Sequence, residues 1–474
     1  MTVLWTAHDA AQATGGKSAV DWAATGVSID TRTLAPGDLF IALSAARDGH
    51  DFVRVAFEKG AAAAMVARVP EGLPNFARDC LLIVPDVLQG LTALGVAARD
   101  RLQAQAQVIA VTGSVGKTTV KDMLHTVLST QGKTHVAQAS YNNHWGVPLT
   151  LARMPVDTDY AVIEIGMNAP GEIAPLVRLA APHAALVTTV APAHLAAFAD
   201  VAAIAHEKAS IFDGLNPNGV ALAHADITTA PILFAKAHAV GARLIRFGAA
   251  ADIEARITDI ALSDRATSAR ITLHGIEHAL TINAPGRHLV LNALATLATA
   301  DAVGVDAAKA VHALQAWRPT AGRGTHARLH LKGADHVVID LIDDAFNANP
   351  ASLAAAVEVL AAASLHPPGR RIAVLGDMLE LGASAPERHA ALAHLPAMAR
   401  IDVVHTLGPL MAHLRAALPP EKRGLHADTA HDMAKTLPHT LQSGDRVLVK
   451  GSKGIGASLV VDALRKLRQA AGEG

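Results

Sequence analysis

Residues 107–121, QVIAVTGSVGKTTVK, constrain the fold of this chain more than any other stretch. The apolar run at 108–111 is typical of a parallel strand covered on both faces, and the apolar spacing after the loop predicts a helix with one buried stripe. Gly113 and Gly116 lie between them and allow the backbone to approach an anion, which the helix N-terminus also attracts. The stretch therefore predicts a strand, a phosphate-binding loop and a helix.

The residue types in this loop predict a nucleoside triphosphate with Mg²⁺ as the ligand. Lys117 can reach the terminal phosphates, and the Thr118 hydroxyl is placed for a nucleotide-bound Mg²⁺. The residues expected to bind the nucleotide here are Gly113, Ser114, Val115, Gly116, Lys117, Thr118 and Thr119. Val111 stands where the general GxxxxGK[ST] loop has glycine, so this loop has the shorter form TGSxGKTT. A plain glycine turn would not explain the lysine and threonines in register, and no NKxD or DxxG supports a GTPase, so we expect ATP.

Composition excludes several other classes of protein. A formal net charge of -1 with 18% charged residues predicts no basic face for nucleic acid. The single cysteine, Cys80, excludes an internal disulfide framework and is expected in the core. No run of about 18 uninterrupted apolar residues occurs, and the N-terminus has no signal-peptide pattern. We therefore expect a cytoplasmic protein without a membrane span, and a monomer.

The alternation of apolar strands with helical stripes predicts an α/β fold in every domain. At about 150 residues per domain, the 474 residues correspond to three domains. The expected domains are 1–86, a small α/β unit; 87–321, which holds the phosphate loop; and 322–474, where HVVIDLI, RRIAVLG, DVVHTLG and DRVLVKG are strands of a doubly wound sheet. The GDMLELG turn lacks the G-x-G-x-x-G spacing, so we expect no dinucleotide site in the last domain.

Glu164, His194 and Lys208 form a second group of candidate site residues. Glu164 and His194 each follow an apolar strand, and ligands of α/β sheets bind at the carboxyl ends of the strands. A carboxylate and an imidazole near bound phosphate suit a divalent metal. Taken singly, each residue has a plainer interpretation: a helix cap for Glu164, a surface residue for His194 and a solvated helix face for Lys208. Their occurrence together with the phosphate loop favours a metal site.

The chain resembles the Mur ligase family over nearly its whole length. The resemblance rests on TGSVGKTT, NNHWGVP, IEIGMNAPGEI, HLAAFADVAAIAHEKASIF, PGRHLVLNAL, AGRG, DDAFNANP, GDMLELG and LVKGS, which occur in the family's order. Within the family, NNHWGVP, DDAFNANP and the absence of a DNPR-type motif resemble the branch that adds D-alanyl-D-alanine to UDP-N-acetylmuramoyl-tripeptide.

The resemblance implies roles around ATP and two Mg²⁺ ions. Thr118 and the β- and γ-phosphates would hold one Mg²⁺, and Glu164, His194 and a carbamylated Lys208 would serve the second. Carbamylation by CO₂ would convert a cation that repels Mg²⁺ into an anion with oxygen acceptors. The family also implies Asn292 at adenine, Arg323 at phosphate and Asp344 at ribose, which would place ATP between the central and C-terminal domains and require closure.

The remaining expected site residues concern the other two substrates. Thr31 and Arg32 resemble the UDP-sugar end of the site, which makes 1–86 the expected UDP-substrate domain. Asn142 and Asn143 resemble central-domain contacts to the same substrate, and the loop that holds Lys450 and Ser452 is expected to face the dipeptide.

Three positions depart from the family pattern. Leu289 replaces an asparagine, Phe346 a tyrosine and Ala345 a serine. Phe346 excludes a hydroxyl-mediated contact, and Ala345 removes a polar group near the nucleotide.

The family implies an ATP-dependent ligase reaction through an acyl phosphate. The tripeptide carboxylate would attack the γ-phosphoryl group, with Lys117 and Mg²⁺ stabilising the spread charge, and the dipeptide amine would then displace phosphate. Two other classes stay open: another ATP-dependent amide ligase of the superfamily, such as a folate polyglutamate or different muramyl-peptide ligase, and a non-ligase ATPase or scaffold.

Overall fold

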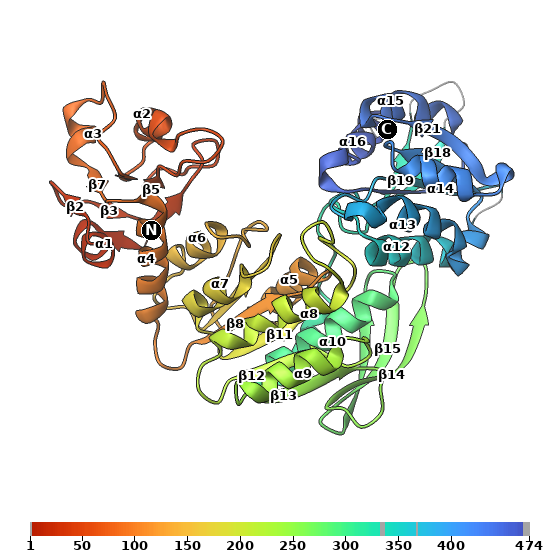
Figure 1. The fold of residues 1–474 in the computed structure, drawn as a ribbon, viewed down its shortest axis with the longest axis horizontal. Coiled ribbons are helices and arrows are strands. Elements are labelled where there is room, and N and C mark those ends of the chain that lie inside the picture. Colours follow the sequence, from red (N-terminus) through yellow and green to blue (C-terminus); the bar gives the residue numbers. More distant parts are fainter. Residues whose placement is uncertain (1, 332–336, 366–367, 468–474) are drawn as a thin grey trace, which may run out of the picture.

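The computed structural model describes residues 2–331, 337–365 and 368–467. Within them the strands of the three main sheets fall into successive parts of the chain, at 17–83, 107–282 and 325–450. Figure 1 shows these parts side by side in chain order, with the central sheet between the N-terminal and C-terminal units. This arrangement confirms the predicted α/β class, whereas the domain boundaries at residues 86 and 321 stay predictions.

The first unit is a small sheet between two pairs of helices. Its strand order is β2-β7-β6-β5-β4, parallel except for β2, and a separate antiparallel pair joins β1 to β3. Helices α1 and α4 pack on one face and α2 and α3 on the other. The bounds are β1 Trp5–Thr6, α1 Ala7–Thr14, β2 Lys17–Ser18, β3 Ala23–Ala24, β4 Gly26–Ser28, β5 Asp38–Ile41, α2 Val53–Glu58, β6 Ala63–Val66, α3 Asn75–Asp79, β7 Leu81–Ile83 and α4 Val87–Asp100. Cys80 is only half-buried, because it ends α3 before the buried strand begins, so its expected core position was wrong.

The central sheet has the order β16-β15-β14-β13-β12-β11-β8-β10-β9 within the described residues. It is parallel from β14 to β9, and β15 and β16 extend it as an antiparallel meander. Helices α5, α10 and α11 cover one face, and α6 to α9 cover the other. The strands are β8 Gln107–Thr112, β9 Thr134–Val136, β10 Tyr160–Glu164, β11 Ala184–Val187, β12 Val220–His224, β13 Arg243–Gly248, β14 Ala255–Leu262, β15 Thr267–Leu273 and β16 Ile276–Ile282.

The helices of this unit are α5 Lys117–Leu128, α6 Gly146–Ala152, α7 Ile173–Ala180, α8 Val201–Ala209, α9 Ala230–Ala239, α10 Arg287–Ala302 and α11 Ala307–Leu314. Strands β8 and β10 are buried almost throughout, which is the burial expected where helices cover both faces of a parallel sheet. Leu289, where the family has asparagine, is 6% exposed and packs in the core beneath α10, so an apolar side chain suits this position.

The C-terminal sheet has the order β17-β18-β22-β19-β20-β21, and every pairing except β17 with β18 is parallel. Helices on both faces make it the doubly wound sheet predicted from the sequence. The bounds are β17 Thr325–His330, β18 Val338–Asp343, α12 Pro350–Ala362, β19 Arg371–Gly376, α13 Ala385–Ala391, β20 Val403–Leu407, α14 Met411–Ala417, β21 Arg423–Ala427, α15 Ala430–Thr436, β22 Arg446–Lys450 and α16 Ser458–Lys466. The first residue of the predicted strand HVVIDLI, His336, lies outside the described residues.

Helix α12 begins as its sequence predicts. The Asn349 side chain accepts a hydrogen bond from the backbone N–H of Ser352, the Ser352 hydroxyl accepts one from the N–H of Asn349, and Pro350 occupies the first turn. Along the described parts of the chain, no helix has both the length and the apolar character needed to cross a bilayer.

Candidate functional site

The phosphate loop is fastened to the end of its neighbouring strand, β11. The Thr188 hydroxyl donates to the Val115 carbonyl at 2.6 Å, and the Ser114 hydroxyl donates to the Ala191 carbonyl at 2.9 Å. Gly113 has φ 150°, and a Cβ there would collide with the Thr188 hydroxyl. The loop therefore needs glycine at this point, and its shape is set before any ligand binds.

The first residues of α5 connect the loop to the predicted metal-site carboxylate. Lys117 Nζ donates to the Gly113 carbonyl at 2.6 Å, and the Thr118 hydroxyl donates to Glu164 Oε2 at 3.0 Å. Glu164 is 1% exposed, and its second oxygen accepts from Asn142 Nδ2 at 2.8 Å. Burial lowers the pKa of Lys117, and the negative charge of Glu164 opposes that shift. The structure thus brings four predicted site residues into one network at the carboxyl ends of β8 and β10.

Arg323 reaches this network from the segment that leads into the C-terminal sheet. Its Nη2 donates to the Thr118 hydroxyl at 3.1 Å, although the two residues lie 205 positions apart in the chain. The guanidinium carbon lies 4.0 Å from the centre of the Phe346 ring, so the ring that replaces the family's tyrosine holds Arg323 through a cation–π contact. Burial lowers the pKa of Arg323, and Glu164 opposes this shift.

Lys208 is a buried lysine without a polar partner. It lies on α8, is 1% exposed, and its ammonium group forms no hydrogen bond or ion pair with any residue that the structure describes. The adjacent Glu207 is engaged elsewhere, since its carboxylate accepts from the backbone N–H groups of Gly171 and Ile173 at 2.7 and 2.9 Å. Burial lowers the pKa of Lys208 well below its usual value, and the positive charge of Lys117 adds to this shift. A solvated helix face, the plainer interpretation of this lysine, is therefore wrong.

His194 lies in the loop after β11 and forms an ion pair with a residue of the C-terminal unit. Its Nδ1 lies 2.6 Å from Glu380 Oε2, and Glu380 belongs to the GDMLELG segment of the C-terminal unit. Burial is the main cause that lowers the pKa of His194, the Glu380 carboxylate opposes it, and Lys117 and Lys208 lower it further. Sequence reasoning missed Glu380, because the GDMLELG segment was considered as a family motif and for dinucleotide binding, and no site residue was assigned in it.

These side chains fit a divalent cation by the chemistry of their donor atoms. The Thr118 hydroxyl oxygen lies 3.0 Å from Glu164 Oε2, and His194 offers an imidazole whose other nitrogen is held by a carboxylate, as is typical of metal-ligating histidines. In the described residues no three His, Cys, Asp or Glu side chains gather to hold a metal. Of the four predicted metal ligands, only Glu164 and His194 are of those types. The other two are Thr118 and Lys208, whose carbamate form is an expectation from the family resemblance.

The remaining nucleotide candidates lie on both sides of the loop. A Cβ at Gly116 would lie 2.6 Å from Asn292 Oδ1, so the Asn292 amide on α10 touches the phosphate loop itself. The Asp344 carboxylate forms an ion pair with Lys450, with Oδ2 2.7 Å from Nζ, and burial raises the pKa of Asp344.

Lys450 and Ser452 have contacts that maintain the fold. Lys450 Nζ also donates to the Asn347 carbonyl at 2.9 Å, and the Ser452 hydroxyl lies 3.2 Å from the Ala348 carbonyl and 2.9 Å from the Leu379 N–H. Both side chains are 3% exposed. They fix the loop that carries Asp344, and their expected contact with the dipeptide stays a prediction.

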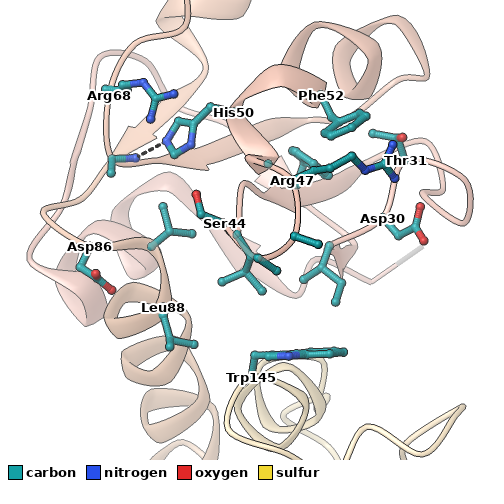
Figure 2. A pocket seen from close by; sticks show the side chains of 18 of the residues that line it. Asp30, Thr31, Ser44, Arg47, His50, Phe52, Arg68, Asp86, Leu88 and Trp145 are labelled. Atoms are coloured by element: carbon teal, nitrogen blue, oxygen red, sulfur yellow. Dashed lines mark hydrogen bonds between the residues drawn. The ribbon is translucent and has the colours of Figure 1, made fainter.

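A cavity of about 990 Å³ lies between the N-terminal unit and the central unit. Figure 2 shows Arg47 and Phe52 at its upper wall, Asp86 and Leu88 from the start of α4 at one side, and Trp145 closing it from below. The lining combines apolar surface with polar and charged groups and includes Asp30, Thr31, Arg32, Ser44, Arg47, His50, Phe52, Arg68, Asp86, Leu88, His144 and Trp145. Of these, only Thr31 and Arg32 were expected from the sequence.

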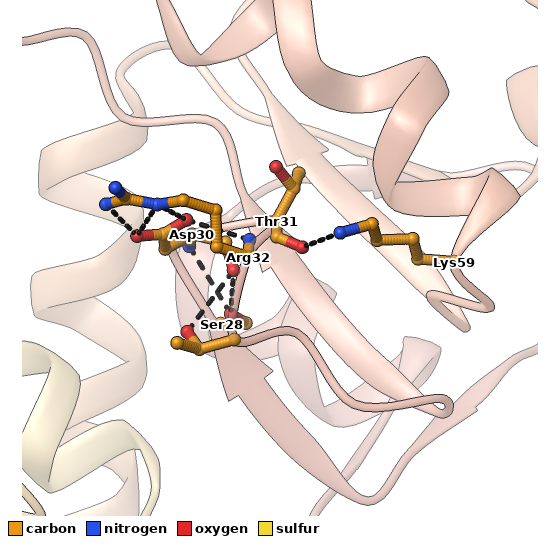
Figure 3. A network of polar contacts seen from close by, with 6 residues as sticks. Ser28, Asp30, Thr31, Arg32 and Lys59 are labelled. Carbon is orange, nitrogen blue, oxygen red and sulfur yellow. Dashed lines mark hydrogen bonds and ion pairs between the residues drawn. The ribbon is translucent and has the colours of Figure 1, made fainter.

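Thr31 and Arg32 sit on a turn that is stiffened by its own polar contacts (Figure 3). The Arg32 guanidinium forms a fork on Asp30, with Nε and Nη2 at 3.0 and 2.6 Å from Oδ2, and this side chain lowers the pKa of Asp30. The Thr31 carbonyl accepts from Lys59 Nζ at 2.7 Å. The Arg32 side chain is 81% exposed, so a ligand in the cavity can reach it.

The NNHWGVP segment links the cavity to the nucleotide site. Asn142 bonds Glu164, while the side-chain Oδ1 of Asn143 accepts from the Gly146 N–H at 2.9 Å and shapes the turn before α6. The two residues between, His144 and Trp145, line the cavity. Asn143 therefore supports the segment, and its expected substrate contact stays a prediction.

Comparison with known proteins gives matches over almost the whole chain. The family described as "Mur ligase middle domain" matches residues 111–300, and "Mur ligase, glutamate ligase domain" matches residues 327–453. The chain is 36% identical to the UDP-N-acetylmuramoyl-tripeptide--D-alanyl-D-alanine ligase of Bacillus subtilis (strain 168) and 38% identical to that of Escherichia coli (strain K12), in each case over 93% of both chains. A crystal structure of MurF from Acinetobacter baumannii superposes with a TM-score of 0.82 at 29% identity, covering 97% of this chain and 99% of that one.

Proposed function

The chain belongs to the Mur ligase family, and we propose that it joins D-alanyl-D-alanine to UDP-N-acetylmuramoyl-tripeptide with cleavage of ATP to ADP and phosphate. The product would be the UDP-linked pentapeptide precursor of peptidoglycan. The observation that carries the proposal is the network of Lys117, Thr118, Glu164 and Arg323, which joins a phosphate loop to the predicted metal carboxylate. The names of the relatives supply the identity of the substrates.

The UDP end of the tripeptide substrate would occupy the cavity beside Thr31 and Arg32. This cavity offers Arg32, Arg47 and Arg68 to a diphosphate and the flat ring of Trp145 to the ligand's apolar surface. The peptide would then extend along the NNHWGVP segment toward Glu164, where Asn142 already bonds the carboxylate.

ATP would bind across the phosphate loop, with Asn292 on adenine, Asp344 on ribose and Arg323 on phosphate. Lys117, now bonded to the Gly113 carbonyl, would turn to the γ-phosphoryl group as negative charge spreads over it. One bound Mg²⁺ would neutralise phosphate charge beside Thr118, and a second would have Glu164, His194 and Lys208 as its protein neighbours.

The terminal carboxylate of the tripeptide would attack the γ-phosphorus, and the bond from that phosphorus to ADP would break. The dipeptide amine would then attack the acyl carbon and release phosphate, with one proton lost from nitrogen. Water would destroy the acyl phosphate, so closure of the C-terminal unit over the site protects the intermediate. We expect the enzyme to act as a monomer in the cytoplasm.

Lys208 would act as a carbamate. A neutral amine is needed to capture CO₂, and the burial that lowers the pKa of Lys208 supplies one. The carbamate would place oxygen ligands where the ammonium group has no partner among the described residues.

An omission assay tests the proposed function. Phosphate release is measured with ATP, UDP-N-acetylmuramoyl-tripeptide and D-alanyl-D-alanine, and then with each left out in turn. We expect sustained release only with all three. Turnover with another amino-acid acceptor but not with D-alanyl-D-alanine would identify a different amide ligase, and release with ATP alone would identify an ATPase.

A further inference from the structure

Two loops from different units meet at the side of the nucleotide site. The Glu380 carboxylate lies 2.6 Å from His194 Nδ1, and the Glu380 carbonyl accepts from the Ala196 N–H at 3.1 Å. A Cβ at Gly382 would lie 3.3 Å from the Ala196 Cα, so the backbones themselves come close. Glu380 therefore fastens the His194 loop with both its main chain and its side chain.

Both partners of the ion pair have unfavourable backbone conformations. His194 has φ 57° and Glu380 has φ 64°, in the left-handed region that non-glycine residues rarely adopt. Such conformations are strained, persist only where the surrounding structure imposes them, and concentrate at functional sites. The conformation of each residue aims its side chain at the other across the boundary between the units.

An exposed ion pair by itself would contribute little to stability. The pair of Arg287 with Glu358 is an example, since both side chains are about half exposed and neither residue is a site candidate. His194 differs because its side chain is only 24% exposed and it lies within the electrostatic reach of Lys117 and Lys208. A carboxylate that accepts from His194 Nδ1 consequently affects the nucleotide site as well as the contact between the central and C-terminal units.

We propose that Glu380 is a positioning residue for the reaction: it holds the proton of His194 on Nδ1 and turns the Nε2 lone pair toward the phosphate site. A carboxylate on one imidazole nitrogen fixes the tautomer and the ring direction, so the other nitrogen is free to act as a ligand. Because Glu380 comes from the C-terminal unit, His194 is set correctly only while that unit is docked. This inference rests on the proposed function for the role of His194.

The test compares variants of Glu380 in the full-length enzyme. Glu380→Gly removes the carboxylate and suits the positive φ, so backbone strain cannot explain its effect, and Glu380→Ala removes the carboxylate while keeping a Cβ. Glu380→Gln keeps a carbonyl oxygen that accepts from Nδ1. Glu358→Ala is the matched control, because it removes an ion pair with Arg287 on the central unit without touching a site candidate.

Two readouts are needed. The first is kcat and KM for amide formation, where Glu380→Gly and Glu380→Ala should lower kcat by about 10–100-fold with the KM for the UDP-tripeptide little changed. The second is the ¹⁵N spectrum of histidine-labelled, nucleotide-free protein, with the His194 signal identified by its loss in His194→Gln. Wild type and Glu380→Gln should show the proton on Nδ1, and the other two variants should lose this preference.

The outcomes separate the explanations. Loss of activity with an unchanged His194 signal would assign Glu380 to docking of the units alone and overturn the proposal. A changed signal with wild-type kcat would overturn it as well, as would equal losses in Glu358→Ala. Failure of the proposed function would appear differently, as a wild-type enzyme that makes no amide product.

Discussion

At the scale of residues, the site depends on two lysines whose positive charge is disfavoured by their surroundings. Lys208 is 1% exposed, and burial lowers the pKa of both Lys117 and Lys208. The charge of Glu164 opposes the lowering of the Lys117 pKa, whereas at Lys208 the charge of Lys117 lowers the pKa further than burial alone. The two lysines therefore suit different tasks, one as a cation for phosphate and the other as a neutral amine for modification.

Replacing Lys117 should abolish most of the turnover without unfolding the protein. Lys117→Ala removes a charge that opposes the negative charge growing in the transition state, so we expect kcat to fall by roughly 100-fold or more. Steady-state kinetics measure the loss, and circular dichroism checks the fold. A folded variant with wild-type turnover would remove Lys117 from the mechanism.

Replacing Lys208 tests the carbamate. Lys208→Ala should be nearly inactive, and a small added carboxylic acid should restore part of the activity by filling the vacated anion site. Lys208→Arg should not be rescued, because its fixed cation would still oppose the metal. Mass spectrometry under CO₂ provides the direct measurement. An active enzyme with an unmodified Lys208 would contradict this prediction.

The sequence was sufficient to predict that Thr118 and Glu164 lie near one another, but not all of the contacts around them. Glu164 and His194 could be identified because each follows an apolar strand, and strand ends of a parallel sheet lie at one edge. Glu380 could not, because it comes from another unit, and its meeting with His194 depends on how the two units dock. Its only sequence signal was its place in the GDMLELG segment.

At the scale of elements, two helices place individual residues against the phosphate loop. Helix α5 begins with Lys117 directly after Gly116, and α10 lays Asn292 against that same glycine. The position of α5 follows from its apolar stripe, which the sequence showed, whereas α10 is buried on most of its sides. The contact between α10 and the loop could not be predicted, because an apolar stripe indicates burial and not the partner against which it is buried.

Asn292 should matter for ATP and not for the UDP substrate. Asn292→Leu removes an amide that is expected to bond the adenine edge, so we predict a higher KM for ATP and a nearly unchanged affinity for the UDP-tripeptide. Initial rates at varied concentrations of each substrate measure this. Equal loss for both substrates would indicate disturbance of the phosphate loop that Asn292 touches.

The cap of α12 offers a test of stability at this scale. Asn349→Ala removes the side-chain acceptor that forms one half of the capping box, which should lower the local stability of the helix by about 1 kcal/mol. Hydrogen exchange of the α12 amides measures the change, with Asn349→Asp as the control, since aspartate caps equally well. Unchanged protection in Asn349→Ala would show that packing alone determines the start of this helix.

At the scale of the whole molecule, each pair of neighbouring units is joined by elements or residues that contact both units. Helix α4 falls inside the predicted central domain, yet Val87, Leu91 and Leu94 pack in the core of the N-terminal sheet. The same core includes Leu149 of α6, so helices of the two units pack in one core. Arg323 and Glu380 make the corresponding connections from the C-terminal side.

The order of the sheets could be predicted from the strand patterns, whereas the joints between them could not. The strands at 338–343, 371–376, 403–407 and 446–450 lie where the apolar runs predict them. The sequence analysis did not predict that β15 and β16 extend the central sheet as antiparallel strands. An alternating apolar pattern indicates which face of a strand is buried, but it does not indicate which sheet the strand joins.

The most direct test of the central claim follows an oxygen atom through the reaction. UDP-N-acetylmuramoyl-tripeptide labelled with ¹⁸O in its terminal carboxylate is incubated with the enzyme, ATP and D-alanyl-D-alanine, and the released phosphate is analysed by mass spectrometry. If the carboxylate attacks the γ-phosphorus to form an acyl phosphate, one carboxylate oxygen leaves with phosphorus, and the phosphate carries one ¹⁸O for each pentapeptide formed. Unlabelled phosphate released alongside the amide product would contradict the acyl-phosphate mechanism.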